Sequence, residues 1–536
     1  MRNRMDVFIR RQKISNCQKW IDRALIVETF FIVLIPDVAV IALIVGLFYW
    51  LYRLKIERKF KLRALPLDFP VALFAGISFA SIFNSNELIF SFLTWIQTAG
   101  FYFLTYIFFG QNLRTIGQIK KVMLAMVLSG LVVIIYSGYQ IFFGIDTAEN
   151  FPWFDPKIQQ TARNRIYATF ANPNVLAGYL DICVCLCIGI IESASDWLKK
   201  AVFSTAVIFF LILLSLTFSR AAMITIAAIF IIYGARWNKK FLLLFLPIAA
   251  VILYLDPALS DRLLTSFDFD DEKSSLALRV SLWKSTLLMI LDHPFLGIGW
   301  GAYQISYPSY DYFLAPFHSS EEILNSSNLY LNFAAEIGIA GLISFLWCML
   351  ESIIISFRMS WVEEKLIEFQ LRTLNFFKDK AMRFFTAPDE ESKPKVDLRK
   401  KIDLVKHYKP RIIYPEIKNP SELNAPEENL HDEEKSNDEP QKSAHVLSFA
   451  EKIHEKKIED MHEGSFKERL EKNLQPENLF NWTEREIFEG LRLGLGLALI
   501  SVLLNGFAYD LPFDFQSAVI IWIVMTFIVC ISEVDE

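Results

Sequence analysis

The sequence has few cysteines and histidines, and neither residue is spaced as disulfide frameworks or metal sites require. It contains 6 Cys and 7 His in 536 residues. The cysteines lie mostly within apolar runs, where they pack as small hydrophobic residues; they are Cys17, Cys183, Cys185, Cys187, Cys348 and Cys530. We therefore expect no disulfide framework and no zinc site, and we expect no other metal or cofactor.

Several motifs of known catalytic and transport machinery are also missing. The chain has no Walker-type phosphate loop, no paired-histidine metal site and no Gly-x-Ser-x-Gly elbow. ATP-driven transport and zinc-dependent hydrolysis therefore have no support. The N-terminus, MRNRMDVFIRRQK, is basic but lacks the apolar core and cleavage site of a signal peptide. We interpret it as a cytoplasmic tail.

Hydrophobic residues, in contrast, are abundant. They make up 53% of the chain, 48 residues are Phe, and the mean hydropathy is +0.33. These values predict an all-α polytopic membrane protein. The net charge of -5 averages an apolar body and a charged segment, and a nucleic-acid partner is not expected.

Apolar runs of bilayer length predict about twelve transmembrane helices. The first apolar block, 24–53, is interrupted by Pro36 and Asp37, so we interpret it as a tight helical hairpin. The other runs lie near 67–84, 88–109, 122–143, 167–191, 200–217, 220–234, 240–255, 329–357, 486–507 and 516–532. No internal repeat is visible.

These runs and the loops between them predict six regions. They are a cytoplasmic basic tail at 1–23, spans 1 to 9 at 24–255, a long extracytoplasmic loop at 256–328, span 10 at 329–357, a charged cytoplasmic insert at 358–485, and spans 11 and 12 with a cytoplasmic C-terminus at 486–536. The insert carries runs such as EKIHEKKIEDMHE, which are typical of solvated helix and disordered chain.

The distribution of Lys and Arg predicts the orientation. The short loops at 53–63, 114–121 and 236–240 are rich in these residues and should be cytoplasmic. Alternation then places 144–166 and 256–328 on the outer face, and both termini in the cytoplasm. We expect a multi-pass protein of a bacterial cytoplasmic (inner) membrane.

We interpret the rest of the chain as a scaffold for the loop 256–328. Within it, apolar residues at 276, 280, 283, 287 and 290 predict an amphipathic helix that ends before Pro294. Arg279 falls on or beside the apolar face. It either snorkels to headgroups or stacks on Trp283, or it forms an anion clamp suited to phosphate. The following HPFLGIGWG predicts a tight, mobile turn.

Charged and amide residues at the edges of spans are further candidates, because such groups are costly in a bilayer unless partnered. Arg220 is either an interfacial anchor or a second cation beside Arg279. Asn172 and Asn174, with Arg163 and Arg165 just outside the span, mark either a helix start or a diphosphate site at a broken helix.

Two carboxylates complete the set of candidates. Glu336 lies roughly two turns into the span that follows Asn328, where it is either a functional group or a hydrogen-bonded structural one. Asp510, in NGFAYDLPFDF, lies in the last outer loop, where a turn residue is the simpler interpretation.

Four stretches together carry a resemblance to a known family. In order they are ATFANPNVLAGYL, FSRAAM, RVSLWKSTLLMILDHPFLGIGWGAY and SSNLYLNFAAEIGIAGL. Their order and topology resemble the O-antigen ligase and polymerase superfamily of bacterial envelope proteins. The resemblance covers roughly residues 60–345. The WFDP stretch before Arg163 and the missing histidine of the last motif look like the cyanobacterial branch once called bicarbonate transporters.

The resemblance implies a GT-C-like, metal-independent and inverting glycan transfer. A glycan would leave a polyprenyl diphosphate carrier for an acceptor on the outer face, with Arg220 and Arg279 holding the diphosphate. Ligases of this family usually carry His-Asn where this chain has Ser327-Asn328, so the usual base is missing. The candidate replacements are His318, Glu321 and Glu322.

We therefore expect catalytic roles for Arg279, Arg220, Glu336 and His318, and substrate-binding roles for Arg165, Arg163, Asn172, Asn174, Asn328 and Tyr330. The partners would be a lipid-linked glycan donor, a glycan or lipid acceptor, membrane lipids and envelope-assembly proteins. Two alternatives stay open: a transporter of bicarbonate or another small anion, and a non-catalytic binder of lipid-linked glycan.

Overall fold

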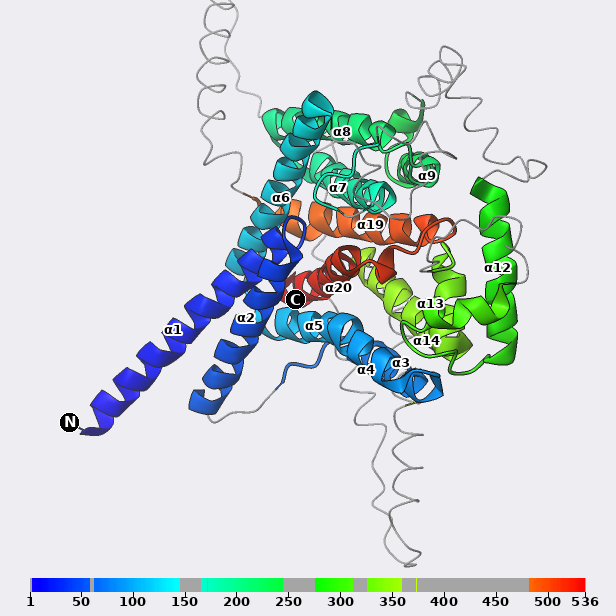
Figure 1. Cartoon of the computed structure of the whole chain (residues 1–536). Coiled ribbons are helices and arrows are strands. Elements are labelled where there is room, and N and C mark those ends of the chain that lie inside the picture. Colours follow the sequence, from blue (N-terminus) through cyan, green and yellow to red (C-terminus); the bar gives the residue numbers. More distant parts are fainter. Residues whose placement is uncertain are drawn as a thin grey trace, which may run out of the picture. The chain divides into compact units, whose positions relative to one another are not determined.

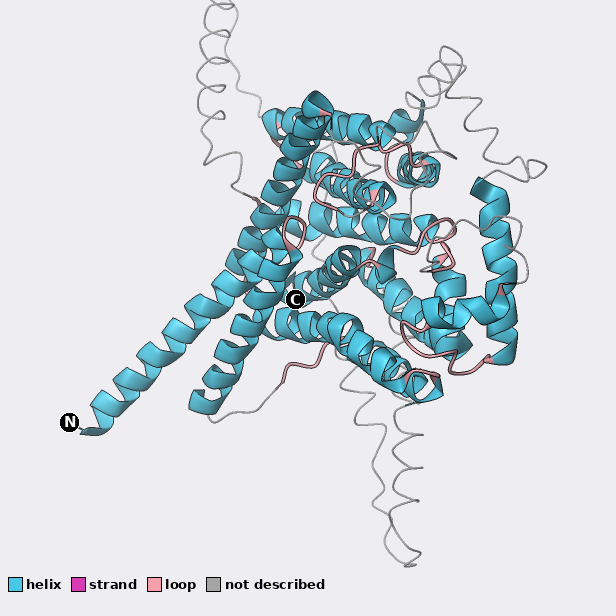
Figure 2. Cartoon of the chain, viewed as in Figure 1, coloured by secondary structure: helices cyan, strands magenta, loops and turns pink. Residues whose placement is uncertain are grey.

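The computed structural model describes residues 2–57, 62–144, 165–170, 172–243, 275–311, 325–358, 373 and 482–535. Every regular element in these ranges is a helix, as Figure 1 and Figure 2 show. The longer elements are α1 (Arg2–Phe31), α2 (Pro36–Glu57), α3 (Asp68–Ser81), α4 (Leu88–Trp95), α5 (Phe101–Asn112), α6 (Ile116–Phe143), α7 (Pro173–Ser193), α8 (Trp197–Leu216), α9 (Arg220–Arg236), α12 (Ser275–Asp292), α14 (Leu329–Ser356), α19 (Arg492–Asn505) and α20 (Phe515–Asp535). The short ones are η1 (Ile82–Asn84), η2 (Ile96–Gly100), α13 (Tyr303–Ser306), η6 (Tyr307–Tyr310), η9 (Glu486–Leu491) and η10 (Leu511–Phe513).

Eight helices in the described part of the chain are long and apolar enough to cross a membrane. They are Pro36–Glu57, Leu88–Asn112, Ile116–Phe143, Pro173–Ser193, Trp197–Leu216, Leu329–Ser356, Glu486–Asn505 and Phe515–Val534. The prediction of an all-α polytopic membrane protein is confirmed. The count of twelve stays a prediction, since most of the expected span 240–255 lies outside the described residues and Asp68–Asn84 and α9 are shorter helices.

The first apolar block forms two helices, α1 and α2, that pack against each other. Pro36 begins α2, a position where its missing N–H costs nothing. Trp20 and Tyr49 stack across the pair with ring centroids 5.5 Å apart. Helix α1 runs without a break from Arg2 to Phe31, so it continues through the region predicted as a tail.

An aromatic cluster around Phe74 of α3 forms part of the buried core. Phe74 is 1% exposed, and its ring centroid lies within about 6.3 Å of rings on α5, α14, α20 and the loop after α12, namely those of Phe103, Phe333, Phe345, Trp522 and Trp300. Aromatic rings bury large apolar areas and pack at defined angles. The cluster therefore fixes the loop after α12 to the helices that span the membrane.

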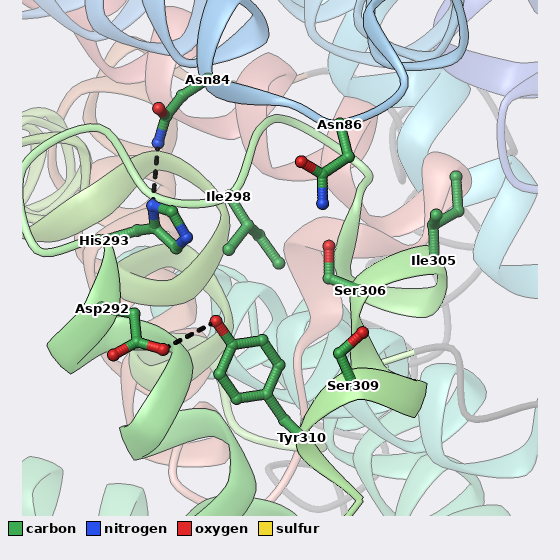
Figure 3. Close-up of a pocket in the computed structure, with 9 residues that line it drawn as sticks. All are labelled: Asn84, Asn86, Asp292, His293, Ile298, Ile305, Ser306, Ser309 and Tyr310. Carbon is green, nitrogen blue, oxygen red and sulfur yellow. Dashed lines mark hydrogen bonds between the residues drawn. The ribbon is translucent and has the colours of Figure 1, made fainter.

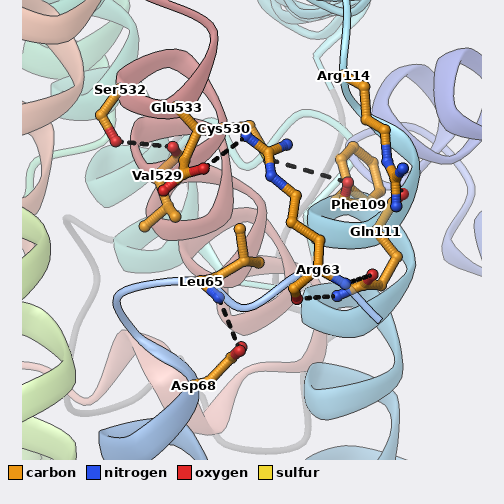
Figure 4. Close-up of polar contacts among 10 residues, drawn as sticks. All are labelled: Arg63, Leu65, Asp68, Phe109, Gln111, Arg114, Val529, Cys530, Ser532 and Glu533. Atoms are coloured by element: carbon orange, nitrogen blue, oxygen red, sulfur yellow. Dashed lines mark hydrogen bonds and ion pairs between the residues drawn. The ribbon is translucent and has the colours of Figure 1, made fainter. Parts of the chain in front are cut away.

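Polar residues at one end of the helices tie distant segments together (Figure 4). The main chain of Arg63 exchanges two 2.8 Å hydrogen bonds with the side chain of Gln111 at the end of α5. The Arg63 guanidinium lies 3.0 Å from Glu533 near the end of α20. Arg114 donates to the Gln111 carbonyl at 2.8 Å. Two of the loops predicted to be cytoplasmic, 53–63 and 114–121, thus meet the end of the C-terminal helix through Arg63 and Arg114.

All six cysteines are buried free thiols. The predicted insert 358–485 lies almost entirely outside the described residues, so its boundaries and its cytoplasmic position stay predictions.

Candidate functional site

Arg165 precedes α7 and is held by two hydrogen bonds. Its Nε donates to the Thr217 carbonyl at 2.6 Å, and its Nη2 donates to Asn174 Oδ1 at 2.7 Å. Burial lowers the pKa of Arg165 to about 10; the phenol of Tyr509 opposes this shift and the charge of Arg279 adds to it. The structure therefore places Arg165 near enough to Arg279 for the two charges to act on each other.

Arg279 lies in the first turns of α12, a helix that the sequence predicted correctly. Burial lowers its pKa; Tyr509 and Asp510 oppose this, whereas Arg220 lowers it further. Within the described residues, the Arg279 guanidinium makes no hydrogen bond or ion pair and does not stack on Trp283. A partly buried guanidinium has five N–H donors, and here they are available to a ligand.

Arg220 begins α9, directly after the turn at Thr217 whose carbonyl binds Arg165. Phe218, two residues before Arg220, has a left-handed backbone with φ of 52°. This sharp turn between α8 and α9 places Arg220 where its charge acts on Arg279. Three arginines from separate parts of the sequence, Arg165, Arg220 and Arg279, thus form one site, which we call the arginine site.

Tyr509 and Asp510 complete the arginine site from the loop between α19 and α20. Asp510 is 2% exposed, and its Oδ2 has no hydrogen-bond partner among the described residues. Burial raises the pKa of Asp510 to about 7, while its own backbone N–H and Arg279 oppose the shift. Asp510 is a turn residue, as the sequence indicated, because its carbonyl accepts from Phe513 N at 2.9 Å. Its neighbour Tyr509 was not singled out from the sequence. The only sequence signal was an acidic residue beside an aromatic one in a loop predicted to be extracytoplasmic.

The residues at the start of α14 hydrogen-bond the end of α19 and the chain between it and the loop of Tyr509 and Asp510. Asn328 caps α14 by accepting from Tyr330 N and Leu331 N at 3.0 and 3.1 Å, and its Nδ2 donates to the Phe507 carbonyl at 3.1 Å. The Tyr330 hydroxyl donates to the Leu503 carbonyl at 2.7 Å. Both side chains, which were predicted to bind substrate, thus hydrogen-bond the segment that leads to Tyr509 and Asp510.

Asn172 has a similar structural task. It caps α7, accepting from Asn174 N at 2.8 Å, and Pro173 occupies the first helical position. This is the helix-start interpretation of the sequence. Asn174, in contrast, contacts the arginine site through Arg165.

Glu336 lies at a break in α14, whose helical backbone is interrupted at Gly338 with φ of 73°. The carbonyls of Ala335 and Glu336 accept from Ile298 N and Gly299 N at 2.8 and 3.0 Å. The Glu336 carboxylate accepts from Gly301 N at 2.8 Å. The broken helix thus binds the glycine loop after α12, and Glu336 anchors that loop from a site that is 3% exposed.

Glycine is required on both sides of this contact. A Cβ at Gly338 would lie 2.1 Å from the Phe295 carbonyl oxygen, and a Cβ at Gly297 would lie 2.4 Å from the Ala335 carbonyl oxygen. Both glycines also have positive φ, which L side chains rarely adopt. The turn predicted as tight and mobile is tight, and it is hydrogen-bonded to α14.

Arg163, His318, Glu321 and Glu322 lie outside the described residues, so their predicted roles stay predictions. No group of three or more His, Cys, Asp or Glu side chains suited to a metal ion occurs among the residues that the structure describes.

Comparison with known proteins bears on this region. A family model described as O-antigen ligase matches residues 205–346, which include Arg220, α12, the glycine loop and Glu336. No curated protein matches the chain. The likeness to the cyanobacterial branch stays a prediction. The apolar helices identify the chain as a multi-pass membrane protein, and its residues 205–346 are similar to the O-antigen ligase family.

Proposed function

We propose that this protein transfers a glycan from a polyprenyl diphosphate carrier to an acceptor hydroxyl at the outer face of a bacterial inner membrane. The observation that carries the proposal is the arginine site, above all the partly buried Arg279 guanidinium without a hydrogen-bond partner among the described residues. Arg165 and Arg220 add positive charge beside it. A planar guanidinium pairs with phosphate oxygens through two parallel hydrogen bonds.

The position of the site within the helices supports this proposal. Helix α20 begins beside the loop that carries Tyr509 and Asp510 and ends near Glu533 and Arg63. The arginine site therefore lies at the opposite end of the helices from the loops predicted to be cytoplasmic. An anionic group held at the membrane boundary, with its lipid tail in the bilayer, fits that position.

Glycan transfer requires the protein to stabilise the leaving group and to remove the proton of the acceptor hydroxyl. As the acceptor oxygen bonds to the anomeric carbon, the bond from that carbon to the diphosphate breaks and negative charge grows on the leaving group. Arginines fixed in a site of low dielectric stabilise that charge without reorganising. The acceptor proton needs a base. His318 is one candidate, and Asp510 is another because a pKa of about 7 suits proton transfer near neutral pH.

The test measures the pool of polyprenyl-diphosphate-linked glycan in cells that lack the protein. We expect the pool to accumulate and the native chain to reverse this. Arg279→Ala should not reverse it, and Arg279→Lys should fail nearly as badly because an ammonium cannot make the two parallel hydrogen bonds. The control is Arg236→Ala, which removes an exposed arginine at the other end of α9 and should behave as native.

An unchanged lipid pool in the deletion strain would contradict the proposal. If bicarbonate uptake fell in the same cells, the anion transporter would become the better explanation. Full rescue by Arg279→Lys would leave glycan transfer standing but remove the bidentate role of Arg279. A non-catalytic binder would instead change the pool equally with the native chain and with Arg279→Ala, provided both chains reach the membrane in equal amounts.

A further inference from the structure

A polar pocket of about 270 Å³ lies beside the end of α12, away from the arginine site. Figure 3 shows its lining, which comes from the link between η1 and α4, the end of α12 with the glycine loop, and the α13–η6 segment. The lining residues are Asn84, Asn86, Asp292, His293, Ile298, Ile305, Ser306, Ser309 and Tyr310. The volume is close to the lower end of the range for small-molecule sites, about 300–1,000 Å³.

The walls of the pocket are fixed by hydrogen bonds. The Tyr310 hydroxyl donates to Asp292 Oδ2 at 2.9 Å, and Asn84 Nδ2 lies 3.3 Å from His293 Nδ1. The same Asn84 amide donates to the Gly297 carbonyl. Because Gly297 is itself packed on α14, the glycine loop holds this wall in place. The glycine loop that Glu336 anchors thus also forms part of the pocket wall.

Other polar groups of the lining are open to a ligand. The side chains of Asn86, Ser306 and Ser309 make no hydrogen bond with any residue that the structure describes. In Figure 3 the amide of Asn86 and the hydroxyl of Ser306 point toward each other across the pocket. Together with the second oxygen of Asp292, these groups supply donors and acceptors in several directions.

The composition of the lining selects a class of ligand. It contains no Lys or Arg and one carboxylate, Asp292, so a phosphate would be repelled rather than bound. An apolar ligand would leave the amides and hydroxyls without partners, which costs free energy. A neutral molecule with many hydroxyl groups satisfies both conditions, and the Tyr310 ring offers it one flat apolar surface.

The pocket and the arginine site each include a residue of the same helix, α12. Asp292 follows Arg279 by 13 positions on α12, which corresponds to about 20 Å along the helix. A single sugar cannot reach both, but an elongated glycan can place its diphosphate at one end of α12 and a distant sugar at the other. We propose that this pocket binds a sugar unit of the glycan substrate, an assignment that rests on the proposed function.

The test is direct binding to the purified full chain in a detergent without a sugar headgroup. One probe is the oligosaccharide released by mild acid from the cell's own lipid-linked pool, which represents the donor. The other is a fragment of the finished surface polysaccharide, which represents the acceptor. Isothermal titration calorimetry gives the affinity of each probe, and the one that binds shows which source the pocket serves.

The variant is Asn86→Leu with Ser309→Ala, which removes two exposed polar side chains of the pocket. We expect the affinity to fall by about tenfold or more, because a net hydrogen bond contributes about fivefold each. Glu87→Gln is the matched control, since Glu87 is exposed, adjacent to Asn86 and outside the lining. Native affinity in the double variant, or no binding of either probe to the native chain, would overturn the assignment.

Failure of the pocket and failure of the proposed function give different results. Arg279→Ala should abolish use of the lipid-linked donor yet bind the released glycan as the native chain does, since that probe has no diphosphate. If the lipid-linked pool never responds to the protein but the pocket variant still weakens binding, the pocket stands and the transfer fails. If transfer occurs and the pocket variant binds the probes as the native chain does, the proposed function is supported and the assignment of the pocket is rejected.

Discussion

The buried carboxyl of Asp510 makes the stability of this protein depend on pH in a direction that can be measured. Burial raises its pKa from 3.8 to about 7 against the opposing effects of its backbone N–H and Arg279. Between these two values the folded chain keeps a proton that the unfolded chain has lost. The free energy of unfolding therefore falls as pH rises, by about 1.4 kcal/mol per pH unit, and stops falling above the folded pKa.

Asp510→Asn removes the ionisation but keeps the shape of the side chain. Over the full interval the native chain should lose on the order of 4 kcal/mol relative to this variant. The variant should thus gain thermal stability over the native chain between pH 4 and pH 8. A thiol-reactive dye can follow unfolding, because all six cysteines are buried free thiols. Asp37→Asn, at an exposed carboxylate, is the control for the change of charge.

Two outcomes would refute this reasoning. A stability difference that does not change with pH would show that Asp510 does not titrate on folding. A native chain that gains on the variant as pH rises would show that pairing with Arg279 outweighs burial, since the folded pKa would then lie below the unfolded value.

Three further predictions address the packing and the topology. Gly338→Ala should lower the apparent unfolding temperature, because its φ is 73° and its Cβ would lie 2.1 Å from a carbonyl oxygen, whereas Gly76→Ala meets no atom within 4 Å and should not. The Lys199 ammonium lies 2.8 Å from the buried Glu486 carboxylate, so Lys199→Met should cost about 3–5 kcal/mol of stability by leaving that carboxylate without its partner. Adding Glu486→Gln should restore much of the lost stability. Equal losses in the single and the double variant would contradict this. A periplasmic reporter fused after Pro308 should be active, and an inactive fusion in a stable protein would reverse the proposed orientation.

Much of the fold could be predicted from local pattern. Apolar runs of bilayer length have one stable solution in a membrane, the helix, because its backbone hydrogen bonds are all internal. The end of α12 before Pro294 and the start of α2 at Pro36 follow from rules that act over a few residues. The four family motifs are likewise visible in the sequence, and their order led to the superfamily that the domain match supports.

The break in α14 was not predictable in the same way. The run from Leu329 to Ser356 is apolar enough to predict a continuous span, even though it contains Glu336 and Glu351. Gly338 alone does not reveal a kink, since glycine also occurs within helices. The kink exists because the loop after α12 supplies replacement hydrogen bonds to Ala335 and Glu336, and that loop lies more than thirty residues earlier in the chain.

The sequence by itself determined the class of the protein, most of its helices and the charged residues that need partners because they lie in or beside membrane spans. Only the tertiary structure decided which of those residues share a site. Asn328 and Tyr330, whose predicted role in substrate binding stays a prediction, hydrogen-bond the chain that leads to Tyr509 and Asp510. That loop, from the far end of the chain, lies where its charges act on Arg279. Local rules fix helices because their hydrogen bonds close within four residues; a site made of side chains hundreds of positions apart depends on how those helices pack.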